Sequence, residues 1–257
     1  MQKTLMDVLK DFPYLGRFVL IGVDLTDTFN FIACGIQGRS PPSRERYYEE
    51  STDRKTLSVK PLAYDKMVRE FQGGNLSANP ELLLYNVIKA HLTGVAVSNG
   101  KQTDSIADLI QPGQKPKSIL ERGLSNWSYE SDPPNNTPRV NGVVNDNQAC
   151  LAILKKDKDG SRLPLYFNVP MTRGRGMLLP TYTGVNMNPL PSFQGEPLEL
   201  ELTATTPTEM VLMLYGALVP QSGDDLRVAV GAMFQNRMDF STMLYSKSRY
   251  EKPVEVK

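Results

Sequence analysis

The chain has 257 residues, of which 40% are hydrophobic, 8% aromatic and 22% charged. These proportions are typical of a globular protein and exclude a disordered, collagen-like or coiled-coil chain. Twenty-nine basic and 28 acidic residues leave a formal net charge of +1, so no global positive field attracts nucleic acid or an anionic membrane. We therefore expect neither of these partners, and any anion-binding site must be local.

The N-terminal segment lacks the continuous apolar core of a signal peptide. Lys3, Asp7, Lys10 and Asp11 interrupt the apolar residues of positions 1–12. No later stretch of about 18 apolar residues would span a bilayer. On these grounds we expect a cytoplasmic protein.

With two cysteines and one histidine, the sequence has few side chains of the types that bind transition metals. Cys34 and Cys150 lie far apart and are flanked by small or apolar residues, which favours buried, reduced thiols. With His91 as the single imidazole, the sequence contains no CxxC motif and no Cys/His cluster with zinc-binding spacing. We predict no metal site.

The first 50 residues predict a helix, a hairpin and a loop. Residues 1–12 have the apolar spacing of a short amphipathic helix that Pro13 ends, and we interpret this helix as an attachment outside the core. Residues 18–23 and 29–33 are apolar runs separated by a polar turn, which is typical of a β-hairpin. Two prolines without amide protons for a sheet ladder place residues 38–50 in a loop.

The middle of the chain predicts two helices and a strand. The Asn-Pro-Glu sequence at residues 79–81 combines an N-cap, a proline at the first helical position and an acid near the positive end of the helix dipole. Residues 82–92 are therefore expected to be helical, and residues 95–97 to form a strand. A second helix is expected over residues 118–126, which begin with capping-box spacing.

The second half predicts mainly strands. Short apolar runs bounded by glycine, proline or charge lie at residues 140–144, 149–154, 165–169, 176–182 and 227–234. Residues 198–203 alternate strictly between apolar and polar side chains, as a half-buried strand does. Thr206 and Pro207 start a helix that runs to about residue 218. Without repeats or a long linker, these elements predict one α+β domain with several layers.

One loop carries the residue types that bind anions. Gly38-Arg39-Ser40-Pro41-Pro42-Ser43-Arg44 places two guanidinium groups and two hydroxyls on a segment that prolines restrict, which suits a phosphate or a carboxylate. The alternative is a solvated loop whose arginines pair with Glu45, Glu49 and Glu50. Arg46 fits that alternative better.

Two further polar clusters follow predicted strands or helices. Residues 98–104, Ser-Asn-Gly-Lys-Gln-Thr-Asp, gather amide, hydroxyl and carboxylate groups that a turn would present to a polyol; the alternative is a turn and helix cap. Residues 129–132 and 136–139 place two acids near an arginine in a proline-stiffened loop, and the alternative is an exposed, salt-bridged loop.

The order of these segments resembles a known family. The motifs are, in order, Tyr14-Leu15-Gly16-Arg17, Gly38-Arg39-Ser40 with Arg44, Tyr85-Asn86, Ser98-Asn99-Gly100 with Thr103-Asp104, and Tyr129-Glu130-Ser131-Asp132 with Asn136-Thr137-Pro138-Arg139. This pattern is similar to that of the archaeal-type IMP cyclohydrolase family, and the likeness covers most of residues 14–234. The chain departs from the pattern in an N-terminal extension (1–13), a longer stretch between Tyr47 and Ala78, and a C-terminal tail (241–257).

The resemblance implies a fold and an assembly. It implies one domain over residues 1–257 with a four-layer αββα sandwich like that of the N-terminal-nucleophile hydrolases, and a homo-oligomer. Because the chain begins Met1-Gln2 and its first hydroxyl residue is Thr4, we do not expect autoprocessing to a terminal nucleophile.

The resemblance also implies an enzyme of the cyclic-amidine hydrolase class. Its reaction is the ring closure of 5-formamidoimidazole-4-carboxamide ribonucleotide (FAICAR) to IMP with loss of water, the final step of purine biosynthesis. No cofactor is implied, because both reacting groups belong to one molecule. The enzyme must hold the carboxamide nitrogen about 3 to 3.5 Å from the formyl carbon.

Within the matching motifs, three residues correspond to catalytic positions of the family: Arg44, Tyr85 and Glu130. We expect Glu130 to exchange protons with the substrate, Tyr85 to donate to the formyl oxygen and Arg44 to orient the substrate or neutralise its charge. Contacts to ribose and phosphate are assigned to Arg39, Ser40, Asn99, Thr103, Asp104 and Arg139. The alternative for Tyr85 is an ordinary core tyrosine with a satisfied hydroxyl.

Two other functions are compatible with these motifs. One is an amide hydrolase on the same scaffold, which the missing terminal nucleophile opposes. The other is a purine-nucleotide sensor that binds IMP without turnover, which Tyr85 and Glu130 oppose.

Overall fold

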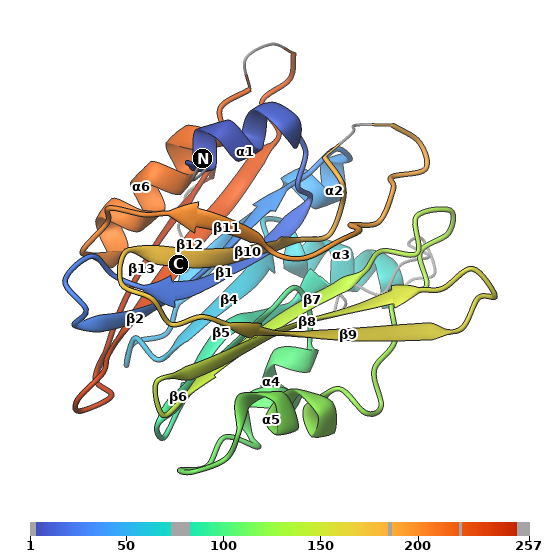
Figure 1. Cartoon of the computed structure of the whole chain (residues 1–257). Helices are drawn as coiled ribbons and strands as arrows, with labels where there is room; N and C mark the ends of the chain where they lie inside the picture. Colours follow the sequence, from blue (N-terminus) through green and yellow to red (C-terminus); the bar gives the residue numbers. More distant parts are fainter. Residues whose placement is uncertain (1–3, 73–82, 185–186, 221–222, 251–257) are drawn as a thin grey trace.

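Two antiparallel β-sheets face each other in the computed structural model, which describes residues 4–72, 83–184, 187–220 and 223–250 (Figure 1). The six-stranded sheet has the order β11-β10-β1-β2-β12-β13. Its strands are β1 (Arg17–Val23), β2 (Phe29–Gln37), β10 (Arg175–Pro180), β11 (Leu198–Glu201), β12 (Arg227–Asn236) and β13 (Thr242–Ser248). The predicted hairpin is confirmed, because β1 and β2 pair antiparallel.

The second sheet has seven strands in the order β3-β4-β5-β6-β7-β8-β9. They are β3 (Arg46–Glu50), β4 (Thr56–Pro61), β5 (Tyr85–His91), β6 (Gly94–Ser98), β7 (Arg139–Asn145), β8 (Gln148–Lys156) and β9 (Arg162–Val169). Apart from β3, β4 and β5, each of these strands was expected from its apolar run.

The main core lies between the sheets, and alternate residues of each strand reach it. In β1, Val19 and Ile21 belong to this core, whereas Phe18 and Leu20 belong to a second core on the outer face of the six-stranded sheet. Because both faces are buried, β1 is a continuous apolar run rather than an alternating one. A third core, which includes Val143, covers the outer face of the seven-stranded sheet.

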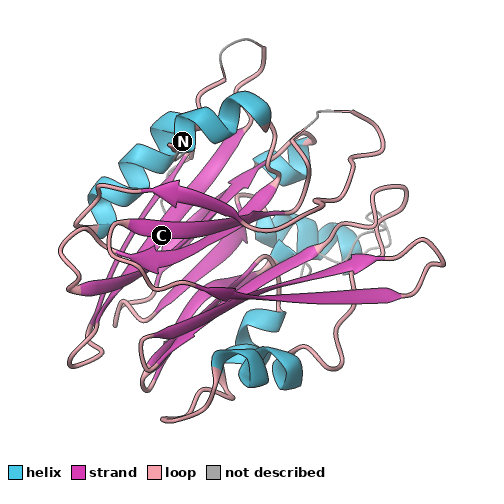
Figure 2. Ribbon diagram, in the orientation of Figure 1, coloured by secondary structure: helices cyan, strands magenta, loops and turns pink. Residues whose placement is uncertain are grey.

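Helices cover both outer faces, which makes the molecule an α+β sandwich (Figure 2). The helices are α1 (Leu5–Asp11), α2 (Pro41–Arg44), α3 (Tyr64–Gln72), α4 (Gln102–Ala107), α5 (Pro116–Gly123) and α6 (Pro207–Ala217). The first and last of these pack on the six-stranded sheet, and α4 and α5 on the seven-stranded one. The predicted N-cap of α6 is confirmed, because Thr206 Oγ1 accepts a hydrogen bond from Glu209 N at 3.2 Å. No helix in the described part of the chain has the length and apolarity to span a membrane.

The N-terminal helix α1 belongs to the core, contrary to its interpretation as an attachment. Its Leu5 and Val8 are 5% and 1% exposed and pack into the core beneath α6. A capping box fixes the start of this helix: Thr4 Oγ1 accepts from Asp7 N, and the Asp7 carboxylate accepts from Thr4 N. The C-terminal tail likewise contributes structure, because β13 pairs with β12 along its length.

Two further expectations from the sequence were wrong. Residues 85–91 form the strand β5 rather than the helix expected over 82–92, because β4 and β6 offer pairing partners on both sides; the expected helix start at 79–81 lies outside the described residues. The segment 38–50 is not a loop throughout, since it contains α2 and the strand β3, whose partner is β4. Two strands that the sequence reading missed, β3 and β4, thus widen the second sheet.

Candidate active site

The predicted motifs meet at one end of the sandwich. In the six-stranded sheet, Arg17 begins β1 and pairs with Ile36, near the end of β2. In the seven-stranded sheet, Tyr85 begins β5, Ser98 ends β6 and Arg139 begins β7. Because neighbouring antiparallel strands run in opposite directions, the start of one lies beside the end of the next. Segments far apart in the sequence are thereby brought to the same edge.

An arginine and a carboxylate join the two sheets at this end. Arg17 donates from both terminal nitrogens to Glu130, with Nη1 to Oε1 at 2.9 Å and Nη2 to Oε2 at 2.8 Å. Its Nη1 also donates to the backbone oxygen of Asn99 at 3.0 Å. The two side chains are only 15% and 24% exposed, so this bidentate pair is stronger than a surface ion pair. Burial works against the charge of Arg17, but the neighbouring Glu130 carboxylate raises its pKa and keeps it a cation.

A second arginine shares the same carboxylate. Arg139 Nη1 lies 3.5 Å from Glu130 Oε1 and donates to Gln102 Oε1 at 3.0 Å. Its guanidinium carbon lies 5.1 Å from the centre of the Trp127 ring. Burial lowers the pKa of Arg139, while Glu130 opposes the change. Glu130 is therefore held as an acceptor between two cations.

The loop before β7 orients Glu130. The backbone nitrogen of Glu130 donates to Thr137 O at 2.8 Å, which closes the loop. Asp132 accepts from Thr137 N at 2.6 Å and from Thr137 Oγ1 at 2.5 Å. Thr137 Oγ1 also lies 2.7 Å from the Tyr182 hydroxyl, and burial raises the pKa of Tyr182 to about 12. These contacts give Asp132 and Thr137 a structural role in presenting Glu130.

Tyr85 points its ring into the core between the sheets, where its hydroxyl is buried. The residue is 6% exposed, and among the described residues nothing hydrogen-bonds to its buried hydroxyl oxygen. The hydroxyl is close enough to Arg17 and Arg139 to act on the charge of both. A buried hydroxyl without a partner is uncommon and costs free energy. Among the described residues, no group supplies the partner that the alternative, a core tyrosine with a satisfied hydroxyl, requires.

Arg39 and Arg44 line a neighbouring cavity of about 490 Å³ beside α1 and the end of α6. Tyr14 also lines this cavity, and the guanidinium carbon of Arg39 lies 5.7 Å from the centre of the Tyr14 ring. Arg44 donates to Gly38 O at 3.1 Å and to Asp224 Oδ2 at 3.2 Å. Neither Tyr85 nor Glu130 lines this cavity, so the contacts of Arg44 face it and not the Glu130 cluster.

Tyr14 lies between the two groups. Its ring stacks on that of Tyr182, with centroids 6.0 Å apart, and Tyr182 reaches the loop that carries Glu130. This close packing requires a glycine at position 16, because a Cβ there would overlap the Tyr182 ring and φ is +70°.

The remaining predicted binding residues have structural partners. Ser40 is the N-cap residue of α2, and its carbonyl accepts from Ser43 Oγ at 2.8 Å. The side chain of Asn99 donates to Pro138 O and accepts from Gln102 and from Val140 N. The structure thus gives Asn99 the turn-and-cap role that was the alternative for residues 98–104.

Thr103 and Asp104 continue this pattern. Thr103 Oγ1 lies 2.5 Å from Ser98 Oγ and 3.1 Å from Gly100 O. Asp104 accepts from Asn86 Nδ2 and from Lys89 Nζ, both at 2.9 Å. It is among the residues lining an open hollow of about 520 Å³ that also involves Tyr85. Of the residues 98–104, Lys101 and Asp104 line this hollow and are therefore the ones placed to face a ligand.

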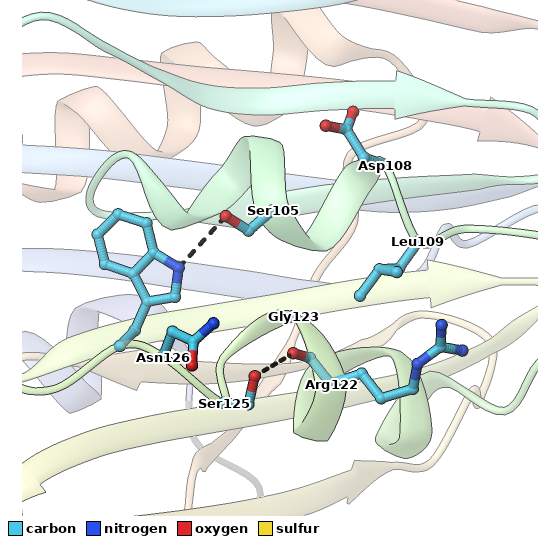
Figure 3. A pocket seen from close by; sticks show the side chains of 8 residues that line it. Ser105, Asp108, Leu109, Arg122, Gly123, Ser125 and Asn126 are labelled. Atoms are coloured by element: carbon cyan, nitrogen blue, oxygen red, sulfur yellow. Dashed lines mark hydrogen bonds between the residues drawn. The ribbon is translucent and has the colours of Figure 1, made fainter.

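A separate hollow of about 460 Å³ lies between α4 and α5 on the outside of the sandwich (Figure 3). Trp127 Nε1 donates to Ser105 Oγ at 3.3 Å, and Ser125 Oγ donates to Arg122 O at 2.9 Å. None of the predicted site residues lines it. Trp127 contacts Arg139 and also lines the hollow that contains Tyr85 and Asp104, so its indole belongs to both hollows.

Sequence reasoning quoted Arg17 in a motif but gave it no role. A signal was present: Arg17, Val19 and Ile21 share one face of β1, so an arginine begins a face that is otherwise apolar. A charged residue at the start of a buried face points to the open end of the core, where a ligand or a counterion is found.

The fold and the site define a class of α+β sandwich proteins with a site suited to a small anionic substrate. The site combines arginines, the carboxylate of Glu130 that two of them share, and the Tyr85 hydroxyl, which has no partner among the described residues. A family model described as IMP cyclohydrolase-like protein matches residues 14–253, and the chain belongs to this family. The resemblance found in the sequence motifs is thereby confirmed.

Several archaeal proteins named IMP cyclohydrolase are similar to the chain. That of Methanococcus aeolicus is 31% identical over 169 residues, which are 66% of this chain and 74% of the relative. That of Methanocaldococcus jannaschii is 27% identical over 188 residues, 72% of this chain and 82% of the relative. That of Methanothrix thermoacetophila is 27% identical over 177 residues, 69% and 78% of the two chains.

Proposed function

We propose that this protein is an IMP cyclohydrolase, which closes FAICAR to IMP with loss of water and without a cofactor. Relatives of that name support the reaction. The observation that carries the proposal is the position of Glu130 between Arg17 and Arg139, at the end of the sandwich where Tyr85 begins β5. The hydroxyl of Tyr85 has no hydrogen-bond partner among the described residues. A carboxylate acceptor and a phenol donor are the two groups that the ring closure needs.

The reaction moves two protons from nitrogen to oxygen. The carboxamide nitrogen attacks the formyl carbon and gives one proton to Glu130, while Tyr85 donates a hydrogen bond to the formyl oxygen as it gains charge. Glu130 passes this proton to that oxygen and then accepts the proton of the former formamide nitrogen. That second proton completes the departing water, and a carbon–nitrogen double bond forms. Glu130 ends the cycle as it began.

The remaining groups serve binding in this proposal. Arg39 and Arg44, on the wall of the 490 Å³ cavity, hold the charged end of the substrate. Arg139, which lies 3.5 Å from Glu130, faces the ribose, with Asp104 on the neighbouring helix. Ser40, Asn99 and Thr103 act through the turns that they stabilise.

The finer description of the fold and assembly is also a proposal. The two sheets with helices on both outer faces support a single domain with the four-layer αββα arrangement of N-terminal-nucleophile hydrolases, without autoprocessing. The family resemblance supports a cytoplasmic homo-oligomer. Sedimentation of the purified protein measures its mass, and a monomer would contradict the oligomer.

The direct test is an assay with chelator-treated protein and FAICAR, in which IMP formation is followed by absorbance or chromatography. We expect turnover well above the uncatalysed rate, and we expect Glu130→Gln to lower kcat more than it raises KM. A protein that binds IMP but leaves the rate unchanged is a sensor, and that result would refute the proposed enzyme.

A further inference from the structure

Arg46 is a buried cation at the open end of the second sheet. The residue is 6% exposed and begins β3. Tyr48, two residues further on, has its hydroxyl 3.5 Å from Cys34 Sγ in the core between the sheets. Because alternate residues of a strand share a face, Arg46 points to the same space between the sheets. It lies at the end where Arg17 and Glu130 meet.

This position differs from the solvated loop assigned to Arg46 from the sequence. Two of the three acids named as partners have other contacts: Glu49 pairs with Lys60, and Glu50 accepts from Ser246 Oγ at 2.9 Å. The strand pairing of β3 with β4 turns the side chain of Arg46 inward and away from solvent.

Arg46 lacks a carboxylate partner among the described residues. Its side chain makes one hydrogen bond, from Nε to Ser43 O at 3.0 Å, which leaves both terminal nitrogens available. Arg17 and Arg139, by contrast, share the carboxylate of Glu130. Removing a cation from water without a counterion is costly. An anionic ligand would supply the missing charge.

Neighbouring groups show that this charge faces the candidate site. Burial raises the pKa of the Tyr14 hydroxyl, and three guanidinium groups work against that rise. They belong to Arg39, Arg17 and Arg46. Tyr14 itself lines the cavity that contains Arg39 and Arg44, so the charge of Arg46 acts on a residue of the cavity wall.

The strand register relates Arg46 to Tyr85. Tyr48 and Tyr85 both pair with Val59 of the intervening strand β4, whereas Arg46 pairs with Pro61, two residues closer to the open end. With about 3.3 Å per residue and about 4.8 Å between strands, Arg46 and Tyr85 are separated by roughly 10 Å across the sheet and roughly 7 Å along it. Two buried polar groups with unused donors therefore face one space, at a separation that suits the two ends of a ribonucleotide.

We propose that Arg46 binds the phosphate of the ribonucleotide substrate while the base lies at Tyr85. This inference rests on the proposed function and adds a residue to its binding site. The two terminal nitrogens of a guanidinium group match two oxygens of a phosphate, and such charge-assisted hydrogen bonds are the strong ones. The segment from Gly38 through α2 to the start of β3 would then offer three arginines to the substrate: Arg39, Arg44 and Arg46.

The test compares a nucleotide with its nucleoside. Calorimetric titrations measure the binding of IMP and of inosine to the wild type, Arg46→Lys, Arg46→Met and the control Arg69→Met, which removes an exposed arginine from α3. We expect Arg46→Met to weaken IMP binding roughly 10- to 100-fold and to leave inosine binding unchanged. Arg46→Lys should lie between the two, and Arg69→Met should match the wild type.

A second measurement uses only the wild type and the conservative variant Arg46→Lys. In the wild type, inorganic phosphate should compete with FAICAR and raise its KM, and in Arg46→Lys the same phosphate concentration should have a smaller effect. Equal losses for IMP and inosine would assign Arg46 a structural role and overturn the inference. Unchanged IMP binding in Arg46→Met would overturn it as well, while turnover by the wild type would leave the proposed function intact. If the wild type neither turns over FAICAR nor binds IMP, both proposals fail.

Discussion

Arg17 and Glu130 are 113 residues apart in the sequence and form a bidentate ion pair, with nitrogen–oxygen distances of 2.9 and 2.8 Å. Arg17 belongs to the six-stranded sheet, and Glu130 to the loop before β7 of the other sheet. The orientation of the proposed proton carrier therefore depends on how the two sheets are placed relative to each other.

Arg17→Met should impair both stability and catalysis. Loss of the charged hydrogen bonds is expected to cost about 2–3 kcal/mol of unfolding free energy, and kcat should fall roughly 10²-fold because Glu130 loses its orientation. Arg17→Lys should have a higher kcat than Arg17→Met, since lysine restores the positive charge but not the bidentate geometry of the guanidinium group. Denaturant titration and steady-state kinetics measure these effects.

A double mutant identifies the partner. In Arg17→Met combined with Glu130→Gln, the loss of stability should be smaller than the sum of the single losses. Additive losses would show that Arg17 stabilises the protein through contacts other than Glu130.

Tyr85→Phe should separate activity from stability. The hydroxyl has no hydrogen-bond partner among the described residues, so its removal relieves a buried, unsatisfied group and leaves the unfolding free energy equal or higher. The same change should lower kcat roughly 10²-fold, because the formyl oxygen loses its donor. Thermal unfolding and kcat are measured on one preparation.

The matched control is Tyr48→Phe, at a tyrosine on the same face of the sheet whose hydroxyl contacts Cys34. This control should keep the activity. A stability loss in Tyr85→Phe without a change in kcat would make Tyr85 an ordinary core residue.

Strand β5, which begins at Tyr85, shows which secondary structure could be predicted from the sequence and which could not. Strands buried on both faces, such as β1 and β8, have unbroken apolar runs that need no partner to be recognised. Residues 82–92 are also apolar, with spacing that is equally compatible with a helix. Strand β4, which the sequence analysis missed, supplies the neighbour that makes β5 a strand. Such pairing is a tertiary effect, and local propensity does not contain it.

The prediction of the site was limited in the same way, because strand pairing is not contained in the local sequence. Order and residue type brought Glu130 and Arg139 into consideration, and the structure places them in contact. Arg46 was assigned to the alternative of a solvated loop paired with nearby acids, whereas the pairing of β3 turns it inward. Which face a residue occupies is decided by strand register, and a one-residue shift reverses it.

Gly231→Ala should disturb the packing of the two sheets. A Cβ at this position of β12 would lie less than 3.0 Å from Leu57 Cδ2 of the facing sheet. We expect a loss of about 1–3 kcal/mol in unfolding free energy. Because the obstacle is the end of a flexible side chain, the combination with Leu57→Ala should lose less than the two single variants together, as measured in urea. Full additivity would contradict the close approach of the sheets.

Leu5→Ala should destabilise the whole domain, although Leu5 lies before the residues that the family model matches. The side chain is 5% exposed in the core beneath α6, so its truncation is expected to cost about 2 kcal/mol. Met6→Ala is the control, since Met6 is 50% exposed on the same helix. An unchanged melting temperature in Leu5→Ala would restore the view that α1 is only an attachment.

The two thiols should make stability depend on pH in the alkaline range. Burial raises the pKa of Cys34 from 9.0 to about 12 and that of Cys150 from 9.0 to about 11. A group whose pKa is higher in the folded state stabilises the protein below its unfolded pKa, and this contribution is lost as the pH rises toward the folded value. We expect the unfolding free energy to be level with respect to these thiols below pH 9 and to decline from pH 9 toward 12. In a variant that combines Cys34→Ala with Cys150→Ala, the decline should be shallower.

The same thiols should react slowly in the native protein. At pH 8 a thiol reagent should label the native protein far more slowly than the unfolded chain, since the thiolate is the reactive form. Rapid labelling of the native protein would show that the thiols are neither buried nor held protonated.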